Sequence, residues 1–194
     1  MRVVEASVCC DGRCEVHDQD DVTFLSGSDM RIVGNYGARR RQPSLPLVLT
    51  PCEVSFLLRR RCLRLRNDQQ HDRRQCDRRC RLVYAALWHR GLYVADGRKF
   101  GADFLVYDGP PQSCHASHLV HVCSEMPLPV DCIRLVRAAT AVKKKVLLAI
   151  NSENNEDNDD DAMSDGASDG EDDHDTDSDR AFDQVQFLQL SRAS

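Results

Sequence analysis

Near residue 91 the hydrophobic residues of the chain change from helical to strand-like spacing. Apolar residues at helical spacing over 82–87 predict a helix from about residue 73 to residue 89, and Gly91 is placed to end it. Short apolar runs bounded by glycine and proline then predict strands at 92–94, 103–107, 118–122 and 146–150, with a helix at 130–139. This order of elements predicts an α/β domain with a mixed sheet flanked by helices.

The first fifty residues carry shorter apolar runs. The runs at 2–8, 22–25 and 30–33 lie between turn residues and predict short strands and loops. Pro46 in the next run, 45–49, favours an edge strand or an extended connection. Thr50, Pro51 and Glu53 then have the pattern of a helix start, and the helix should reach residue 59. The sequence thus predicts a small mixed α+β N-terminal domain, residues 1–70.

An acidic tract interrupts the C-terminal part of the chain. Residues 151–180 hold fourteen Asp and Glu and one basic residue, Arg180. With so few aromatic and β-branched residues the tract cannot bury a core, so we expect a disordered insertion. The apolar run 185–190 follows it and predicts a last strand, which extends the second domain over residues 71–194.

The net charge of the whole chain hides an uneven distribution. The 194 residues sum to −5, but the acidic tract alone carries −13, and the rest has 25 basic against 17 acidic residues, or +8. Residues 59–81 hold ten arginines and three aspartates, which fits either a solvated surface or a phosphate-facing patch. A polyanionic partner therefore becomes a possible ligand of the basic part.

Length and composition exclude several classes of protein. With 41% hydrophobic residues the chain can form one domain or two small ones. No apolar run approaches the about 18 residues of a membrane span, so we expect no membrane insertion. The chain starts without a signal-peptide pattern, so its ten cysteines are expected to be reduced thiols in the nucleus or cytosol. Cys14 and His17 supply only half of a zinc-type spacing, and we predict no metal site and no cofactor.

Three residue types suited to metal-free RNA cleavage occur near the ends of predicted strands. Tyr107 ends one strand, His115 follows a Gly-Pro-Pro turn, and lysines 143–145 precede another strand. Cleavage of RNA needs a base for the ribose 2′-OH, an acid for the departing 5′-oxygen and a cation for the phosphorane charge. By spacing alone an ordinary role is the favoured interpretation of each: Tyr107 as a strand aromatic, His115 as a turn residue and the lysines as solvated charges.

A metal-dependent nuclease is the other enzymatic alternative. Asp96, Asp103 and Asp108 lie in the strand region and could bind Mg²⁺. The next strand, 118–122, lacks the second acid and the lysine that a restriction-type site would need. This alternative has little support from the sequence.

The same region resembles the catalytic domain of the tRNA-splicing (tRNA-intron) endonucleases. The resemblance rests on Leu-Trp-His-Arg-Gly at 87–91, Lys-Phe-Gly-Ala-Asp-Phe-Leu-Val-Tyr at 99–107, His115 and Ala-Val-Lys-Lys at 141–144. It is strong from residue 82 to residue 150. It is fainter in the opening strands and at 45–53, which are similar to the smaller N-terminal domain of the family. The resemblance implies a nuclease-type C-terminal domain.

The resemblance also implies roles for individual residues. Tyr107 would be the general base on the 2′-OH, His115 the general acid on the leaving oxygen, and Lys144 the stabiliser of the transition-state charge. Lys143 or Lys145 could take the place of Lys144, since the three lysines are consecutive. The products would be a 2′,3′-cyclic phosphate and a 5′-hydroxyl, and no metal or cofactor would take part. A free tyrosine is a poor base at neutral pH, so Lys143 and Lys145 are candidates for the positive charge that would help it.

The partners that the resemblance implies are precursor tRNA and other subunits of a splicing endonuclease. The chain looks most like the eukaryotic catalytic subunit that cuts the 3′ splice site. This resemblance implies a heterotetramer with a second catalytic subunit and two structural subunits. The expected location is the nucleus, with the cytoplasm as the alternative. In the family an acidic loop docks into a basic cleft of a partner, and the tract 151–180 could do this or only keep the chain soluble. The alternative function is a non-catalytic RNA-binding or assembly subunit of the same complex.

Overall fold

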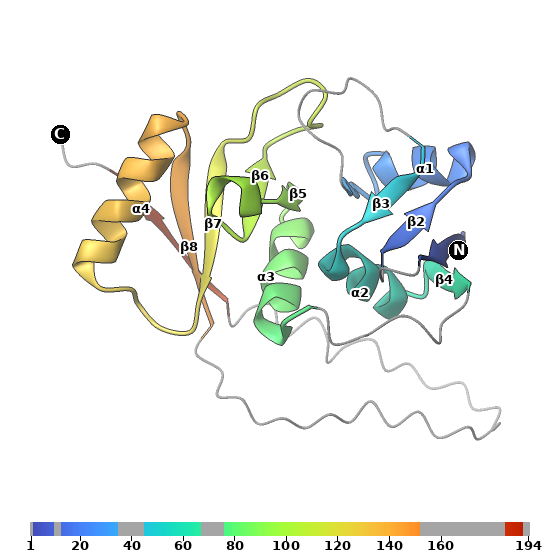
Figure 1. Ribbon diagram of the computed structural model, residues 1–194, viewed down its shortest axis with the longest axis horizontal. Coiled ribbons are helices and arrows are strands. Elements are labelled where there is room, and N and C mark those ends of the chain that lie inside the picture. Colours follow the sequence, from blue (N-terminus) through green and yellow to red (C-terminus); the bar gives the residue numbers. More distant parts are fainter. Residues whose placement is uncertain (1, 10–12, 35–44, 67–75, 152–184, 192–194) are drawn as a thin grey trace, which may run out of the picture.

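The computed structural model describes residues 2–9, 13–34, 45–66, 76–151 and 185–191. They form two mixed β-sheets, each accompanied by two helices, and the two sheets lie side by side along the longest axis of the molecule (Figure 1). The predicted α/β class with a small first unit and a mixed C-terminal sheet is confirmed. The predicted boundary at residue 70 lies outside the described residues and stays a prediction.

The first unit is a four-stranded sheet covered by two helices. In the sheet order β3-β2-β1-β4, β1 runs parallel to β4 and antiparallel to β2, and β2 is antiparallel to β3. Alternate residues of β1 are buried against apolar residues of α1 and α2. The elements are β1 (Val4–Val8), β2 (Cys14–Val16), α1 (Gln19–Ser26), β3 (Leu47–Leu49), α2 (Pro51–Arg59) and β4 (Leu63–Arg66).

Two of the short apolar runs do not form the predicted strands. Residues 22–25 lie inside α1, because Asp18 caps this helix by accepting hydrogen bonds from the backbone N–H groups of Asp20 and Asp21, both at 2.9 Å. Of the run 30–33, Ile32 forms one isolated parallel bridge to Val94. The run after Pro46 does form a strand, β3, at the edge of its sheet as predicted.

The predicted start of α2 is confirmed, and it is tied to a buried carboxylate. Thr50 caps the helix, Pro51 is its first residue, and Glu53 completes the capping box. Oε2 of Glu53 accepts from the N–H and the hydroxyl of Thr50 at 2.8 Å, while Oε1 accepts from the N–H groups of Val33 at 3.0 Å and Gly34 at 2.7 Å. Glu53 has no exposed surface, so this single side chain joins α2 to the segment that follows α1.

The second unit is a five-stranded sheet in the order β5-β6-β7-β8-β9. The strands are antiparallel to their neighbours except for the parallel pair β7–β8. The crossover between these two strands is α4, which covers one face of the sheet. The elements are α3 (Arg78–His89), β5 (Tyr93–Asp96), a 3₁₀ turn (Arg98–Phe100), β6 (Phe104–Tyr107), β7 (His118–Cys123), α4 (Pro129–Ala141), β8 (Lys145–Ile150) and β9 (Gln186–Leu190).

The two faces of this sheet bury different residues. Phe104 and Val106 pack into the core that contains α3, whereas Leu105 and Tyr107 pack into the core that contains Ala139 of α4. Helix α3 starts at Arg78 and not near residue 73, because Asp77 is its N-cap and its carboxylate accepts from the N–H of Arg79. Gly91, with φ +80°, follows the end of α3 as predicted.

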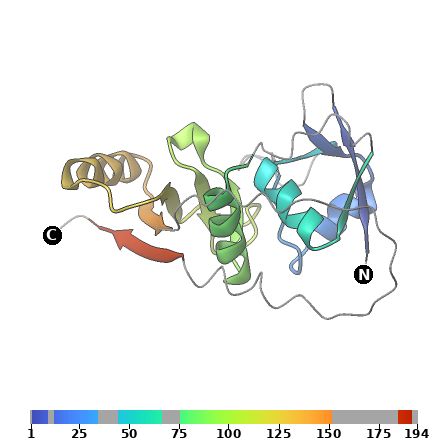
Figure 2. The ribbon, with the colours of Figure 1, turned by 90° about the horizontal axis from the view of Figure 1, so that it is seen from below.

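Aromatic rings and a disulfide connect the two units. The ring of Phe56 on α2 lies 4.8 Å from that of Trp88 and 5.5 Å from that of Tyr84, both on α3, and these two helices are neighbours in both views (Figures 1 and 2). Cys52 and Cys76 form a disulfide, with their Cα atoms 5.7 Å apart. The expectation of reduced thiols is wrong for this pair, because the packing of α2 beside α3 brings together two cysteines that are 24 positions apart.

The acidic tract and the strand that follows it were predicted in the last part of the chain. From residue 152 to residue 180 the acidic tract lies outside the described residues, so its predicted disorder stays a prediction. The final strand is confirmed as β9, which pairs antiparallel with β8 at the sheet edge. Within the described ranges no helix has both the length and the apolar character that crossing a membrane requires.

Candidate active site

The topology of the second sheet brings the three candidate catalytic positions to one edge. Strand β6 ends at Tyr107, and β7 starts at this edge because it is antiparallel to β6. Strand β8 also starts here, directly after Lys144, because it is parallel to β7. Tyr107, the loop with His115 and Lys144 therefore come from three adjacent strands at the same end of the sheet.

Tyr107 is the most buried of the three. Its residue is 2% exposed and packs in the core between the sheet and α4. Burial raises the pKa of Tyr107 above its ordinary value of 10, and the nearby Cys114 adds to this rise. The side chain is therefore a neutral phenol at neutral pH in the unliganded chain.

His115 lies in the loop between β6 and β7, which backbone hydrogen bonds hold at both ends. The N–H groups of Ser113 and Cys114 donate to the carbonyl of Pro110, and the N–H of Ser117 donates to the carbonyl of Val106 at 2.8 Å. His115 itself is exposed. An exposed imidazole on an anchored loop is accessible to a substrate while its backbone is fixed.

The neighbours of His115 connect it to the other two candidates. Cys114, on one side, is close enough to Tyr107 to influence its pKa. On the other side, the carbonyl of Ala116 accepts a hydrogen bond from Nζ of Lys144 at 3.2 Å. Each of the two sequence neighbours of His115 is therefore close to one of the other two candidates.

The three consecutive lysines differ in their surroundings. Lys143 is exposed and has a left-handed backbone with φ +55°, which ends α4. The N–H of Lys144 then donates to the carbonyl of Ala139, and its side chain is half-buried with Nζ on Ala116. Lys145 is exposed at the start of β8. The local turn thus directs Lys144, among the three, toward the His115 loop.

His118, a competing candidate for the acid role, has a different environment. Its Nδ1 lies 2.8 Å from Oγ of Ser117, and its Nε2 lies 3.3 Å from Oε1 of Gln189 on β9. Both ring nitrogens therefore have protein partners. His115 is the more exposed histidine of this edge.

The Lys-Phe-Gly-Ala-Asp-Phe string forms a tight turn between β5 and β6. A Cβ on Gly97 would lie 2.7 Å from the carbonyl carbon of Phe104 and 2.8 Å from its nitrogen, so this position requires glycine. Gly101 has φ +71°, and Oδ2 of Asp103 accepts from the N–H of Val122 at 2.8 Å. The turn presents Phe100, which the sequence did not single out, beside Lys144.

Two of the three aspartates considered for a metal, Asp96 and Asp103, have other partners. Asp96 pairs with the guanidinium of Arg98 and also accepts from the backbone N–H of Arg98. Partial burial raises the pKa of Asp96, but these two hydrogen bonds and the charge of Arg98 together outweigh it, so the pKa lies below its ordinary value. Asp103 binds the backbone of β7. Throughout the part of the chain that the structure describes, no three His, Cys, Asp or Glu side chains gather as a metal site would require.

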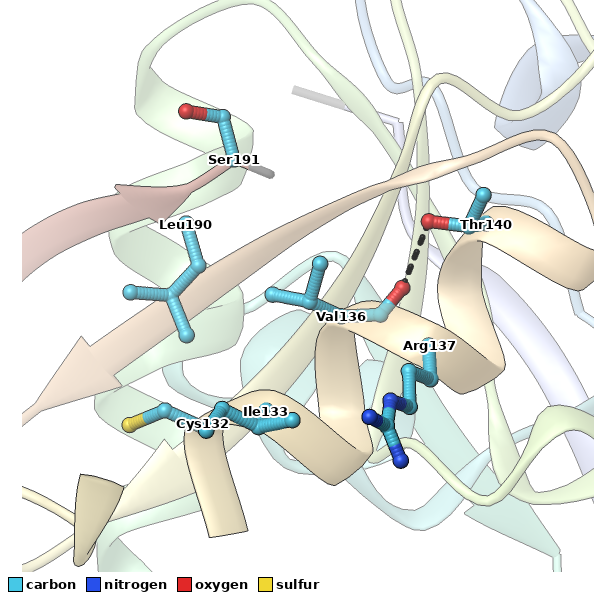
Figure 3. A pocket seen from close by; sticks show the side chains of 7 residues that line it. All are labelled: Cys132, Ile133, Val136, Arg137, Thr140, Leu190 and Ser191. Carbon is cyan, nitrogen blue, oxygen red and sulfur yellow. Dashed lines mark hydrogen bonds between the residues drawn. The ribbon is translucent and has the colours of Figure 1, made fainter. Parts of the chain in front are cut away.

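A sizeable cavity lies elsewhere on this unit. It measures about 480 Å³ and opens between α4 and the end of β9 (Figure 3). Three of its seven lining side chains are aliphatic, and the hydroxyl of Thr140 donates to the carbonyl of Val136 at 2.7 Å. Its wall contains none of the three candidate catalytic residues; it consists of Cys132, Ile133, Val136, Arg137, Thr140, Leu190 and Ser191.

Known proteins are similar to the segment that carries this edge. Residues 77–159 match the family model described as tRNA intron endonuclease, catalytic C-terminal domain. The chain is 41% identical over 68 residues to tRNA-splicing endonuclease subunit Sen34 of Mus musculus and 38% identical to that of Homo sapiens, covering 34% of this chain and 22% of each relative. It is also 40% identical over 70 residues to the tRNA-splicing endonuclease of Hyperthermus butylicus, covering 35% of this chain and 39% of that protein.

The chain thus spans between about a fifth and two fifths of the length of these curated relatives. The matched segment contains α3, the strands β5 to β8 and α4, and with them Tyr107, His115 and Lys144. The resemblance to the tRNA-splicing endonucleases is therefore confirmed, and it rests on residues 77–159, which match the catalytic C-terminal domain of the tRNA intron endonuclease family.

Proposed function

We propose that this chain is a catalytic subunit of a tRNA-splicing endonuclease and cleaves precursor tRNA at an intron boundary. The observation that carries the proposal is the meeting of Tyr107, the His115 loop and Lys144 at one sheet edge, within the segment that matches this family. A structural subunit would not need these three residue types at one place. The Sen34 relatives are named as subunits of a tRNA-splicing endonuclease, which supports a subunit role for this chain. That the subunit cuts the 3′ splice site is proposed from the resemblance of its sequence alone.

In the proposed reaction the ribose 2′-oxygen attacks the adjacent phosphorus. Tyr107 as phenolate takes the 2′-OH proton, the new P–O2′ bond forms, and the P–O5′ bond breaks. His115 in its protonated form gives its proton to the departing 5′-oxygen. The ammonium of Lys144 faces the non-bridging oxygens, on which negative charge grows. The products are a 2′,3′-cyclic phosphate and a 5′-hydroxyl, without metal or cofactor.

The buried position of Tyr107 sets a requirement for this scheme. Because burial raises its pKa, the phenolate is a small fraction at neutral pH. Positive charge near the bound phosphate has to increase that fraction. Lys143 and Lys145, at the same end of the sheet as Lys144, are suited to supply it.

The same proposal includes the domain division, the partners and the location. Residues 71–194 form the catalytic domain, and residues 1–70 form a smaller N-terminal domain. The chain works in the nucleus, in a heterotetramer with a second catalytic subunit and two structural subunits. A non-catalytic RNA-binding or assembly role in the same complex is the alternative.

End-group analysis tests the proposed function. Cells expressing the tagged full chain provide the complex that co-purifies with it, and intron-containing precursor tRNA is the substrate. We expect one intron boundary to be cut by this subunit in the presence of EDTA, leaving a 2′,3′-cyclic phosphate and a 5′-hydroxyl. Loss of the cut in EDTA, or a 3′-hydroxyl product, would favour a metal-dependent nuclease.

A basic surface of the first unit provides a separate test of RNA binding. Arg59, Arg61 and Arg64 are exposed at the end of α2 and on β4. The affinity for RNA falls as salt increases, and the steepness of this fall reflects the number of phosphate contacts. If the three arginines bind phosphates, replacing all three by Gln should make the slope of log affinity against log salt shallower, by roughly one for each arginine–phosphate pair that is removed. Filter binding of precursor tRNA between low and physiological salt measures this slope.

Arg134 is a suitable control for that experiment, because it is exposed on α4 and paired with Asp131 at 3.1 Å. Arg134→Gln should leave the salt slope nearly as it is. An unchanged slope in the triple variant would assign the arginines of the first unit to a solvated surface.

A further inference from the structure

Phe100 is an exposed aromatic residue beside the candidate catalytic lysine. It ends the 3₁₀ turn Arg98–Phe100 and is 41% exposed, although a large apolar side chain gains stability from burial. Nζ of Lys144 lies 5.8 Å from the centroid of its ring, within the range of cation–π contacts. The ring thus faces an ammonium group that, in the proposed reaction, stabilises the growing negative charge.

The turn that carries Phe100 is held firmly in place. The N–H of Phe100 donates to the carbonyl of Gly97 at 2.8 Å, and the N–H of Gly97 donates to the carbonyl of Asp103 at 3.0 Å. Asp96 accepts from both the backbone and the guanidinium of Arg98. With the close packing of Gly97 against Phe104, these contacts fix the backbone that positions the ring.

The contacts of Lys144 fit the chemistry expected of it. A lysine that stabilises phosphorane charge must be fixed in space, but a carboxylate partner would neutralise it before the substrate binds. In the described ranges, no carboxylate lies within 4.0 Å of Nζ of Lys144. The carbonyl of Ala116 and the ring of Phe100 hold it instead, and both attract a cation without carrying a net charge.

We propose that Phe100 is a positioning residue for cleavage, whose ring holds the Lys144 ammonium at the place where it meets the scissile phosphate. The inference rests on the proposed role of Lys144. It predicts that the aromatic character of residue 100 affects the chemical step and not the affinity for RNA. An apolar side chain of similar size, without a π-system, cannot replace it.

Single-turnover cleavage of precursor tRNA by the co-purified complex separates these effects, since it gives a cleavage rate constant at saturation and a half-saturating concentration. We expect Phe100→Leu to lower the rate constant by about three- to tenfold, with the half-saturating concentration within about twofold of wild type. Phe100→Tyr, which keeps the ring, should restore the rate.

A matched control exists in the first unit. Phe24 is a partly buried phenylalanine with the guanidinium of Arg2 5.4 Å from its ring centroid, so Phe24→Leu removes the same kind of contact away from the site. It should leave the cleavage rate constant unchanged. Circular dichroism and the melting temperature of each variant show whether it is folded.

The outcomes distinguish this inference from the proposed function. If Lys144→Ala abolishes cleavage but Phe100→Leu cleaves at the wild-type rate, the inference is wrong and the proposed function stands. A rise in the half-saturating concentration alone would also overturn it, because the ring would then bind RNA and not the lysine. Normal cleavage by Lys144→Ala would reject the proposed role of the lysine, and the inference with it.

Discussion

Replacing Tyr107, His115 or Lys144 is expected to lower precursor-tRNA cleavage at one splice site by about 10²- to 10⁴-fold each. A positioned acid or base contributes about this factor, and loss of a fixed charge on the phosphorane costs a similar amount. Tyr107→Phe, His115→Ala and Lys144→Ala remove these groups at the edge where β6, β7 and β8 meet. Single-turnover cleavage at each splice site measures the loss, and filter binding checks that RNA is still bound.

His118→Ala is the matched control for this prediction. His118 lies at the start of β7, close to the same sheet edge, but both of its ring nitrogens have protein partners. We expect this variant to retain most of the cleavage activity. Normal cleavage by all three site variants would contradict the catalytic role and leave a binding or assembly subunit as the better account.

Glu53→Ala is expected to lower the free energy of unfolding by about 3 kcal/mol, because it leaves buried donors without acceptors. The wild-type carboxylate accepts from the N–H groups of Val33, Gly34 and Thr50 and has no exposed surface. Its loss would release the α2 N-terminus from the segment after α1. Urea unfolding of the full chain measures the change.

An exposed carboxylate provides the control for this effect on stability. Glu125 is exposed in the connection between β7 and α4, so Glu125→Ala should change the free energy of unfolding by less than about 0.5 kcal/mol. A small effect of Glu53→Ala, equal to that of Glu125→Ala, would contradict the structural role of the buried carboxylate.

The pH dependence of stability provides a second test of the buried carboxyl group of Glu53. Burial raises the pKa of Glu53 in the folded chain above the 4.5 of a free glutamate, although its hydrogen bonds act in the opposite direction. The folded state therefore keeps a proton that the unfolded state has lost, so stability should fall as pH rises from 4.5 through the folded pKa. The side chain in Glu53→Gln does not titrate, so the stability of this variant should lack the decline. If the free energies of unfolding of wild type and Glu53→Gln fell in parallel with pH, the decline would not come from Glu53.

Local patterns in the sequence predicted the elements whose signals lie within a few residues. The start of α2 was predictable because the capping residue, the proline and the glutamate occupy nearby positions with fixed roles. The run 22–25 was misassigned because so short a run, with three apolar residues, suits a strand and a helix equally, and the deciding cap, Asp18, lies outside the run. The strands of the second sheet were predicted to within a few residues because glycines and prolines separate them.

The residues of the candidate site are brought together by the pairing of strands that are distant in the sequence, which no local pattern predicts. Tyr107 and Lys144 are 37 positions apart, and only the parallel pairing of β7 with β8 brings Lys144 to the edge where β6 ends. Resemblance to a family suggested these residues, whereas their spacing alone did not. Phe100 and the Cys52–Cys76 pair also went unrecognised, because their partners come from other elements of the fold.

In the proposed reaction, His115 protonates the leaving 5′-oxygen during RNA cleavage. A precursor tRNA with sulfur in place of that single 5′-oxygen tests it directly, because a thiolate leaves without needing a proton. We predict that His115→Ala cuts this substrate within about tenfold of the wild-type rate while cutting the oxygen substrate about 10²- to 10⁴-fold more slowly. Tyr107→Phe should remain slow on both substrates. An equally large defect of His115→Ala on the sulfur substrate would contradict the assignment of His115 as the general acid.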